Sequence, residues 1–401
     1  MNKLDSKNKN IWIINQYAGS SNHGMTFRSY FLAKEFIKRH RVTIFSASFS
    51  HVMSNPPLVS KTYTKENIDG INYLWLKVPI YKQSKSLGRL ISMFIFLFRL
   101  FFLDVKKCDS PNVIIVSSAS PLPIWKAYFW ARRFNAKLIF EVRDIWPLSI
   151  MELGGFKKIN PFVILLQITE NFAYRVSDYV VSVLPKAFEH MEYHGLDLPR
   201  FKYIPNGIEI KTLIKTDIQN KNVFKIGYAG TLGIANALKY LIYAANLIKE
   251  TNIEIHLLGN GPEKKTLMGI VNDKNISNVY FHDAIPKNEV GIFLSKMDAL
   301  YIGWHFSKIY RFGISANKLF DYLASAKPII HSVDAGNDPV LEAKAGISVQ
   351  PENPKDIANA ILKLYKMPVS KRNELGQNGR AYVEKYHSYE QLAKQYEYLF
   401  N

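Results

Sequence analysis

The chain has 401 residues, which is too many for one ordinary domain and suits two. Hydrophobic residues make up 48% of it, which excludes a disordered chain, and its single cysteine, Cys108, excludes both a disulfide framework and a zinc site built from cysteines. Lysine and arginine outnumber the acidic residues by 52 to 33, for a net charge of +19. We therefore expect an anionic partner, which is nucleic acid, acidic lipid or a phosphorylated substrate.

Short apolar segments alternate with helical patterns along most of the chain, as in βαβ units with parallel sheets. The first ten residues are polar and lack an apolar stretch, so we expect no signal peptide. The predicted strands lie at 11–16, 42–46, 113–117, 137–142, 179–184, 224–229, 253–258, 279–282, 299–303 and 328–332. They form two sheets, with the seam expected in the polar stretch 211–222.

Two segments of the first half depart from the strand–helix pattern. Residues 68–71 indicate a turn between two short strands, a local elaboration within 52–86. Residues 87–103 form an apolar helix that Arg89 and Arg99 interrupt, and the uncharged part is much shorter than the roughly 18–20 residues that span a bilayer. Four lysines flank it: Lys82, Lys85, Lys106 and Lys107. Such a helix either packs in the first domain or lies on an anionic membrane surface.

Ligands of parallel sheets bind where the strands end, so the loops after the strands are the candidate sites. Residues 17–26 follow the first strand and contain Gly24, in either a plain loop or a ligand-binding one. Arg143 and Asp144 follow the fourth strand, either as a surface ion pair or as members of a catalytic crevice. In the second half, glycine-containing loops follow two successive strands, at 228–233 with Gly230 and at 258–263.

Segment 312–325 carries the sharpest prediction. Ser315 is a suitable N-cap for a helix on which Asn317, Lys318 and Asp321 share one face. A helix N-terminus with one lysine suits a diphosphate, and a carboxylate one turn later can accept hydrogen bonds from a ribose diol. The alternative is a solvated helix face with a Lys–Asp pair.

Several common sites have no sequence pattern here. There is no Asp-x-Asp triplet, HExxH or His-x-His pair, so no metal site is predicted. There is no Gly-x-Ser-x-Gly elbow or P-loop, and no RNP, helix-turn-helix or zinc-finger pattern, which argues against hydrolases, ATPases and nucleic-acid binding.

At these residues the chain resembles the retaining glycosyltransferases of family 4, over nearly its whole length. The similarity rests on His23-Gly24, the 143–147 segment RDIWP, the 204–209 segment IPNGIE and the 314–322 segment ISANKLFDY. The last of these is typical of the bacterial O-antigen and capsule branch that contains N-acetylfucosamine transferases.

The resemblance implies the GT-B fold, an α/β architecture in which two Rossmann-like domains face each other across a cleft. We expect residues 1–212 with a returning C-terminal helix at 384–401 to form the acceptor domain, and residues 213–383 to form the nucleotide-sugar domain.

The resemblance also implies roles for single residues. Asp321 is expected to bind the donor ribose, backbone amides from Ser315 to Asn317 the diphosphate, and Ile285 the base. Gly24 and Gly230 lie where loops approach the donor, and Arg143 where a residue touches the donor sugar. Asp144 is expected to orient Arg143 or the acceptor, Lys318 to stabilise the leaving diphosphate, and His23 and Arg28 to bind the acceptor.

Two departures from the family pattern concern the donor phosphates and the proton relay. The family has two glutamates eight residues apart, whereas here Asp321 keeps the second and Gly313 replaces the first. No basic residue follows the Gly230 loop, so Lys318, with Arg311, is expected to supply the missing charge.

The resulting expectation is a cytoplasmic enzyme, peripheral on the inner membrane face, that transfers a sugar from a UDP-linked donor with retention. The acceptor is expected to be a polyprenyl-diphosphate-linked saccharide of O-antigen or capsule synthesis, with no metal cofactor and no nucleic-acid partner. Two alternatives stay open: a UDP-sugar 2-epimerase of the same fold, and a non-catalytic basic protein that binds membrane or nucleic acid.

Overall fold

The computed structural model describes residues 8–24, 28–83, 86–106, 108–117, 120–210 and 223–401. It divides the chain into two compact units: unit 1 comprises residues 1–205 and 389–401, and unit 2 comprises residues 206–388. The predicted seam at 211–222 lies outside the described residues, as do Lys85, Lys107 and residues 25–26.

Unit 1 is built on an eight-stranded sheet of order β3-β4-β2-β1-β5-β6-β7-β8, parallel except for the β3–β4 pair. Its strands are β1 Asn10–Ile14, β2 Arg41–Ala47, β3 Tyr63–Ile68, β4 Ile71–Leu76, β5 Val113–Ser117, β6 Lys137–Val142, β7 Tyr179–Ser182 and β8 Phe201–Tyr203. The turn predicted at 68–71 is confirmed: Asp69 and Gly70 both have positive φ and join β3 to β4 in a hairpin.

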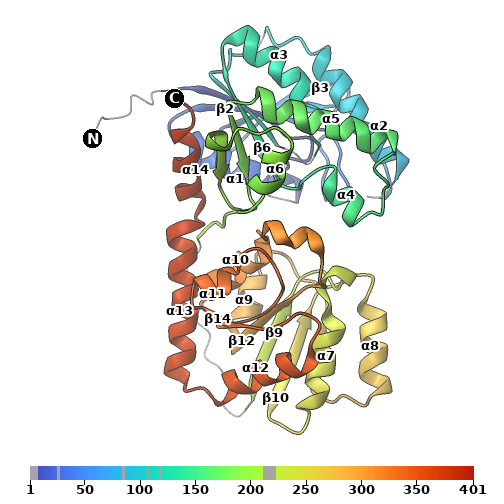
Figure 1. Cartoon of the computed structure of the whole chain (residues 1–401), viewed down its shortest axis with the longest axis vertical. Coiled ribbons are helices and arrows are strands. Elements are labelled where there is room, and N and C mark those ends of the chain that lie inside the picture. Colours follow the sequence, from blue (N-terminus) through green and yellow to red (C-terminus); the bar gives the residue numbers. More distant parts are fainter. Residues whose placement is uncertain (1–7, 25–27, 84–85, 107, 118–119, 211–222) are drawn as a thin grey trace, which may run out of the picture. The chain divides into compact units, whose positions relative to one another are not determined.

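Helices cover both faces of this sheet (Figure 1). They are α1 Arg28–Phe36, α2 Leu87–Phe101, α3 Ile124–Phe134, α4 Leu148–Glu152, α5 Pro161–Val176, α6 Phe188–Tyr193 and α14 Tyr389–Tyr398. Successive side chains of β1 point to opposite faces, so Ile11 and Ile13 join the core under α1 and α14, whereas the Trp12 ring lies 5.4 Å from Trp130 of α3. The predicted return of the C-terminal helix to the first domain is confirmed.

Unit 2 contains a six-stranded parallel sheet of order β11-β10-β9-β12-β13-β14. Its strands are β9 Phe224–Ala229, β10 Ile253–Leu258, β11 Val279–His282, β12 Ala299–Gly303, β13 Ile329–Ser332 and β14 Gly346–Ser348. Its helices are α7 Leu238–Leu247, α8 Lys264–Asp273, α9 Val290–Ser295, α10 Asn317–Ala324, α11 Pro339–Glu342, α12 Pro354–Lys366 and α13 Val369–Tyr386. All ten predicted strands are present, and a separate pair of core clusters lies on the two faces of this sheet.

Candidate active site

Two glycine-containing loops lie back to back at the carboxyl edge of the unit 2 sheet. The Gly230 N–H donates to Leu258 O at 2.9 Å, and the Leu232 N–H donates to Asn260 O at 2.9 Å. A Cβ at Gly259 would overlap the Gly230 carbonyl, and one at Gly261 would overlap the Leu232 carbonyl. Glycine is therefore required for the two loops to approach each other, and the Gly230 N–H is used within the sheet edge.

Lys318 of α10 reaches the first of these loops. Its Nζ donates to Tyr228 Oη at 2.7 Å and to Asn236 Oδ1 at 3.1 Å, and a Cβ on Gly230 would lie 2.7 Å from Lys318 Cε. Burial lowers the pKa of Lys318 to about 8. The ammonium is thus poised against the loop, and an anion placed beside it would favour its charged form.

The end of β9 is fixed to α10 by one further side chain. The Tyr322 hydroxyl accepts a hydrogen bond from the Ala229 N–H at 2.7 Å and donates to the Ala229 carbonyl at 3.1 Å. Tyr322 is fully buried, as are Leu319, Phe320 and Leu323. This buried face of α10 sets Lys318 at the strand end.

The prediction that Ser315 caps α10 is wrong. The helix begins at Asn317, with Ala316 as the N-cap residue and no side-chain cap within the described chain. Ser315 instead holds Asn206: its Oγ accepts from the Asn206 N–H at 2.8 Å, and its carbonyl accepts from Asn206 Nδ2 at 2.6 Å. Among the residues that the structure describes, no side-chain cap bonds the first amides of α10, which suits an anion.

Asp321 lies one turn along α10 and is paired with Lys287, which the sequence argument did not single out. The Asp321 side chain is 28% exposed, so its carboxylate can exchange this partner for a ligand hydroxyl. Lys287 comes two residues after the half-buried Ile285, in the loop after β11. The structure therefore brings the predicted ribose and base residues to one part of unit 2, while Asn317 is exposed at the helix start.

The loop that precedes α10 is braced by Asn337. Its side chain accepts from the Ile314 N–H at 2.7 Å and donates to the Ile314 carbonyl at 3.2 Å. Gly313 has a φ of 103°, which favours glycine strongly over a residue with a side chain. This backbone accounts physically for glycine where the family has its first glutamate. Arg311 is exposed and donates to Lys308 O at 2.5 Å.

In unit 1, the loop with His23 and Gly24 is anchored from both sides. The His23 ring is buried, with Nδ1 2.7 Å from Ser20 Oγ and its centre 4.6 Å from that of Trp75, and burial lowers its pKa. Gly24 has a φ of 80°, and a Cβ there would lie 2.5 Å from Ser54 Oγ. Gly24 itself is exposed, so its backbone is accessible to a ligand.

Arg28, predicted to bind the acceptor, is only 2% exposed. Its guanidinium donates to Glu141 Oε2 at 2.7 Å, to the Ile204 carbonyl at 2.8 Å and to the carbonyl of Pro205. In this arrangement the side chain ties α1 to the end of β6 and to the segment after β8. An acceptor that reached Arg28 would have to displace these bonds, so its role in acceptor binding stays a prediction.

Arg143 and Asp144 lie after β6, as the predicted strand requires. Arg143 is half-buried and Asp144 is exposed. Burial opposes ionisation of Glu141, but the charges of Arg28 and Arg143 and the bond from Tyr396 lower its pKa overall. Glu141 is thus a buried carboxylate that bonds Arg28 and whose pKa the charge of Arg143 also lowers, and it was not identified from the sequence.

Comparisons with known proteins bear on this arrangement. Residues 210–382 match the family model of glycosyl transferases group 1. No curated protein matches the chain. Among solved structures, sucrose-phosphate synthase from Thermosynechococcus elongatus is similar at a TM-score of 0.74 and 16% identity, over 98% of each chain.

Two further solved structures are similar over almost their whole length. Anabaena HepE, in complex with UDP and glucose, has a TM-score of 0.64 and 15% identity, over 97% of this chain and 98% of that one. The E. coli structure described as trehalose-6-phosphate bound with UDP-2-fluoro glucose has a TM-score of 0.71 and 12% identity, over 98% and 99%. These similarities confirm the predicted GT-B fold.

Proposed function

We propose that this chain, a glycosyltransferase with the GT-B fold, transfers a sugar from a UDP-linked donor, with retention, to a polyprenyl-diphosphate-linked saccharide. The observation that carries the donor part is the Lys318 ammonium, held at the first turn of α10 against the Gly230 loop. A fixed charge and uncapped helix amides at one point match a diphosphate.

The proposed chemistry needs no protein nucleophile. Negative charge develops on the diphosphate as the bond to the sugar breaks, and the α10 amides with Lys318 would stabilise it there. The leaving phosphate would take the proton of the acceptor hydroxyl. Asp321 would leave Lys287 and accept hydrogen bonds from the ribose, with the base against the Ile285 backbone.

For the remaining residues of unit 1, the proposed roles follow the family resemblance. Gly24 would approach the donor phosphates, Arg143 would position the donor sugar, and Asp144 would orient Arg143 or the acceptor. His23 and Arg28 are the proposed acceptor residues. Because Arg28 is buried in an ion pair with Glu141, we propose that it acts on the acceptor indirectly, by positioning the end of β6.

UDP is the proposed nucleotide, and the donor sugar is proposed to be an N-acetylated or deoxy hexose. Two of the similar structures were solved with UDP or a UDP-sugar, which supports UDP. The 314–322 segment resembles the branch of O-antigen and capsule synthesis, which supports the sugar class and the lipid-linked acceptor.

An assay of UDP release from a panel of UDP-sugars, with and without a polyprenyl-diphosphate-linked acceptor, tests this proposal. We expect acceptor-dependent release from one UDP-sugar, and a loss of about a hundredfold in kcat for Lys318→Met. Lys371→Met, at an exposed lysine of the same unit, is the control. Interconversion of UDP-GlcNAc without acceptor would instead identify the epimerase, and no turnover of any UDP-sugar would reject the proposal.

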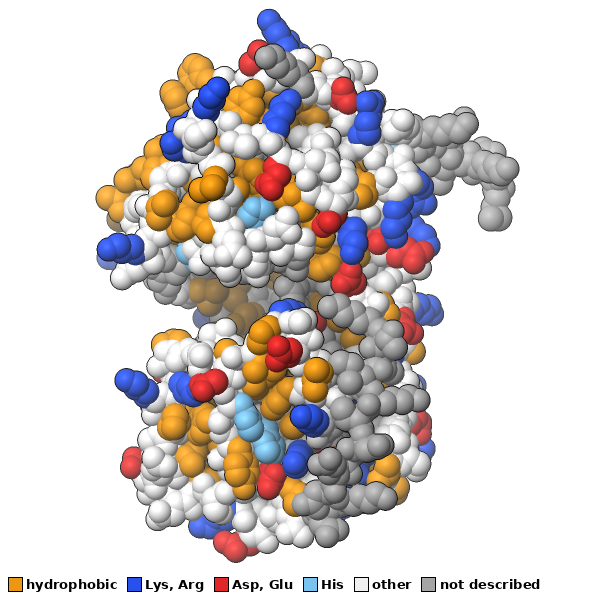
Figure 2. Space-filling view, turned by 180° about the vertical axis from the view of Figure 1, so that it is seen from behind, with side chains coloured by type: hydrophobic (Ala, Val, Ile, Leu, Met, Phe, Trp, Pro, Cys, Tyr) orange, Lys and Arg blue, Asp and Glu red, His pale blue; other side chains and the backbone are white. Residues whose placement is uncertain are grey.

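The proposed location is the inner face of the membrane, and α2 supplies the surface for it. Exposed apolar side chains of this helix and its C-cap line one surface, which we term the α2 face: Ile91, Phe94, Phe98, Phe101 and Phe102. A shallow groove of about 600 Å³ runs along it. In the reverse view, hydrophobic side chains gather on the side of unit 1 where Figure 1 places α2 and α4 (Figure 2).

The α2 face continues onto a neighbouring helix. The Phe94 ring lies 6.4 Å from that of Phe162 on α5, and Ile164 and Ile168 of α5 are 47% and 52% exposed. Basic residues adjoin these helices: Lys126 donates to the Phe101 carbonyl at 3.0 Å, exposed Lys106 follows α2, and exposed Lys157 and Lys158 precede α5. Contiguous apolar side chains with a basic rim match an anionic bilayer surface. No helix among the described residues is long and apolar enough to span a membrane.

Vesicle flotation tests the membrane proposal. We expect binding to vesicles with phosphatidylglycerol, weaker binding to neutral vesicles, and a loss of about tenfold or more in Phe98→Ser/Phe102→Ser, since each phenyl ring contributes about 1.5–3 kcal/mol on burial. Leu247→Ser, at an exposed leucine of unit 2, is the control. Equal binding by the double variant and the control would remove the α2 face from the proposal.

A further inference from the structure

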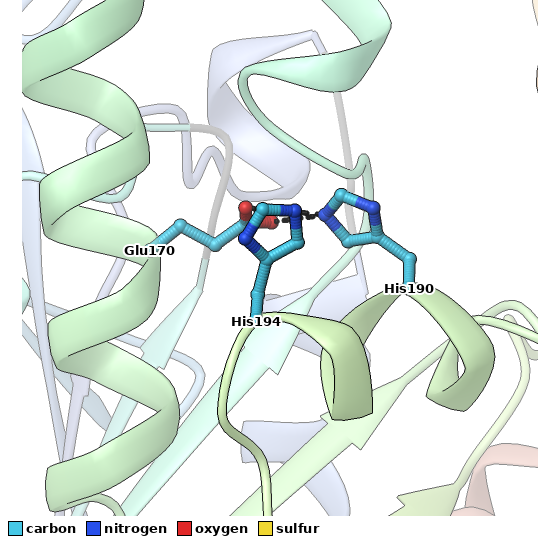
Figure 3. Close-up of side chains that lie close together, drawn as sticks. All are labelled: Glu170, His190 and His194. Atoms are coloured by element: carbon cyan, nitrogen blue, oxygen red, sulfur yellow. Dashed lines mark hydrogen bonds and ion pairs between the residues drawn. The ribbon is translucent and has the colours of Figure 1, made fainter.

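Three side chains that are scattered in the sequence converge in unit 1, outside the proposed active-site residues. Glu170 lies on α5, His190 lies on α6, and His194 is the C-cap residue of α6 (Figure 3). One ligand atom from each lies within 4.8 Å of the other two. Within the described part of the chain, this is the one such group of three metal-ligating side chains.

The carboxylate of this group is buried and needs a positive partner. Glu170 is 2% exposed, and it accepts hydrogen bonds from the Tyr174 hydroxyl at 2.7 Å and from Gln167 Nε2 at 2.8 Å. Its third partner is His190 Nε2, at 3.2 Å from Oε2. Of these three partners only His190 can carry a positive charge, and an ionised carboxylate in the interior is costly without a counter-charge.

The distances fit a metal ion in place of a shared proton. Ligands at zinc bond lengths of 2.0–2.1 Å in a tetrahedron lie about 3.3 Å apart. The His190–Glu170 separation is already 3.2 Å, and the two imidazole centres are 4.4 Å apart. Gln167 Nε2 donates to Glu170 Oε2 and to Asn171 Oδ1, both at 2.8 Å, and lies 3.0 Å from His194 Nδ1, so the second histidine lies beside the carboxylate.

A second group of one glutamate and two histidines has a different geometry, in which the side chains do not point toward one common position. In unit 2, Glu254, His256 and His282 form a relay: His256 Nε2 lies 3.0 Å from Glu254, and His256 Nδ1 lies 3.0 Å from His282 Nε2. Opposite nitrogens of one ring make these two contacts, so the three groups point along a line. One ion cannot reach all three, which makes this relay a matched control.

We propose that Glu170, His190 and His194 form a binding site for a first-row divalent transition ion, with zinc as the expected occupant. Two imidazoles and one carboxylate are ligands that zinc accepts, and a water would complete the tetrahedron. The ion would join α6 to α5 and so stabilise unit 1. It has no part in the proposed transfer chemistry, which is expected to proceed without metal.

Isothermal titration of the chelator-treated full chain with Zn²⁺ tests the site. We expect one equivalent to bind, and His194→Gln to weaken binding by about a hundredfold or more, because losing even an outer partner of a ligand costs about 10–100-fold. His256→Gln should leave the binding unchanged. Far-ultraviolet circular dichroism of each variant establishes that it is folded.

Cobalt substitution gives a readout that a purely structural network would not produce. We expect Co²⁺ to give the strong visible absorption of a tetrahedral site in the wild type and in His256→Gln, and not in His194→Gln. The proposal is overturned if the wild type takes up no zinc, if His194→Gln binds as tightly as the wild type, or if only His256→Gln loses the ion.

Discussion

Lys318 is the charged side chain that we propose binds the donor diphosphate in unit 2. Its ammonium contacts Tyr228 and Asn236, which lie 90 and 82 residues away in the sequence, and its carbon stem lies against Gly230. Burial lowers its pKa from 10.5 to about 8, so near neutral pH it keeps its proton with a small margin. A diphosphate would raise that pKa again, and this couples nucleotide binding to pH.

We therefore predict that the affinity for UDP is level up to about pH 7.5 and falls by up to about tenfold per pH unit above about pH 8, where the free enzyme loses the Lys318 proton and the complex keeps it. Titrations in two buffers of different ionisation enthalpy should show proton uptake in that range. Lys318→Met should bind weakly at every pH without this slope. If the UDP affinity of the wild type depended on pH no more than that of the variant, Lys318 would not be the group that binds the phosphate.

Arg28 differs from Lys318: it was predicted to bind a ligand, but in the structure its side chain makes contacts that stabilise the fold. Its charge is buried against Glu141, and both partners are 3% exposed or less at the side chain. Removing one partner of a buried pair leaves the other charge uncompensated. The sequence could not reveal this pairing, because Glu141 lies 113 residues away, in an apolar strand whose pattern does not indicate a partner for a buried carboxylate.

Arg28→Met should therefore destabilise the chain by about 3–5 kcal/mol in denaturant unfolding. The exposed Arg41–Asp109 pair of the same unit provides the comparison, since Arg41→Met should cost less than about 1 kcal/mol. Equal costs for the two variants would show that the Arg28 network contributes little, and direct acceptor binding by Arg28 would then regain weight.

At the scale of elements, the sequence predicted the strands and helices that carry hydrophobic patterns. The ten strands are short apolar segments and the helix at 87–103 has an apolar pattern, and each appears in the structure. Strands β3, β4, β8 and β14 were not predicted individually, and two of them, β8 and β14, have three residues each. The helix cap at Ser315 was wrong because Asn206, 109 residues away, competes for it.

The two glycine loops of unit 2 make a prediction at this scale. Gly261→Ala would push the Leu232 carbonyl away, so we expect a loss of about 1–3 kcal/mol in stability, as for overpacking, together with weaker UDP binding. Gly269→Ala in α8 meets nothing within 4 Å and should stabilise by up to about 1 kcal/mol. Thermal unfolding and UDP titration of both variants check this. The prediction requires that Gly261→Ala lowers the stability and that Gly269→Ala does not.

For the molecule as a whole, the fold and the candidate donor-binding residues could be predicted from the sequence, but the side chains that contact those residues could not. Gly230, Lys318 and Asp321 were identifiable because a strand, a loop and a helix N-terminus follow one another along the chain. Tyr228, Lys287 and the metal-ligand group depend on contacts across the sheet or between helices. The sequence signal for that group was the spacing of four between His190 and His194, and neither a helix nor a metal site was predicted there from the sequence.

Calorimetric titration with UDP and with GDP, without added metal, tests the central claim that α10 holds the donor nucleotide. We predict that UDP binds and that Asp321→Ala weakens it by about tenfold or more, because a hydrogen bond to a charged group contributes about 1.5–3 kcal/mol. Asp273→Ala, at an exposed aspartate of α8, should bind UDP as the wild type does. Failure of the wild type to bind either nucleotide, or unchanged binding by Asp321→Ala, would contradict the account.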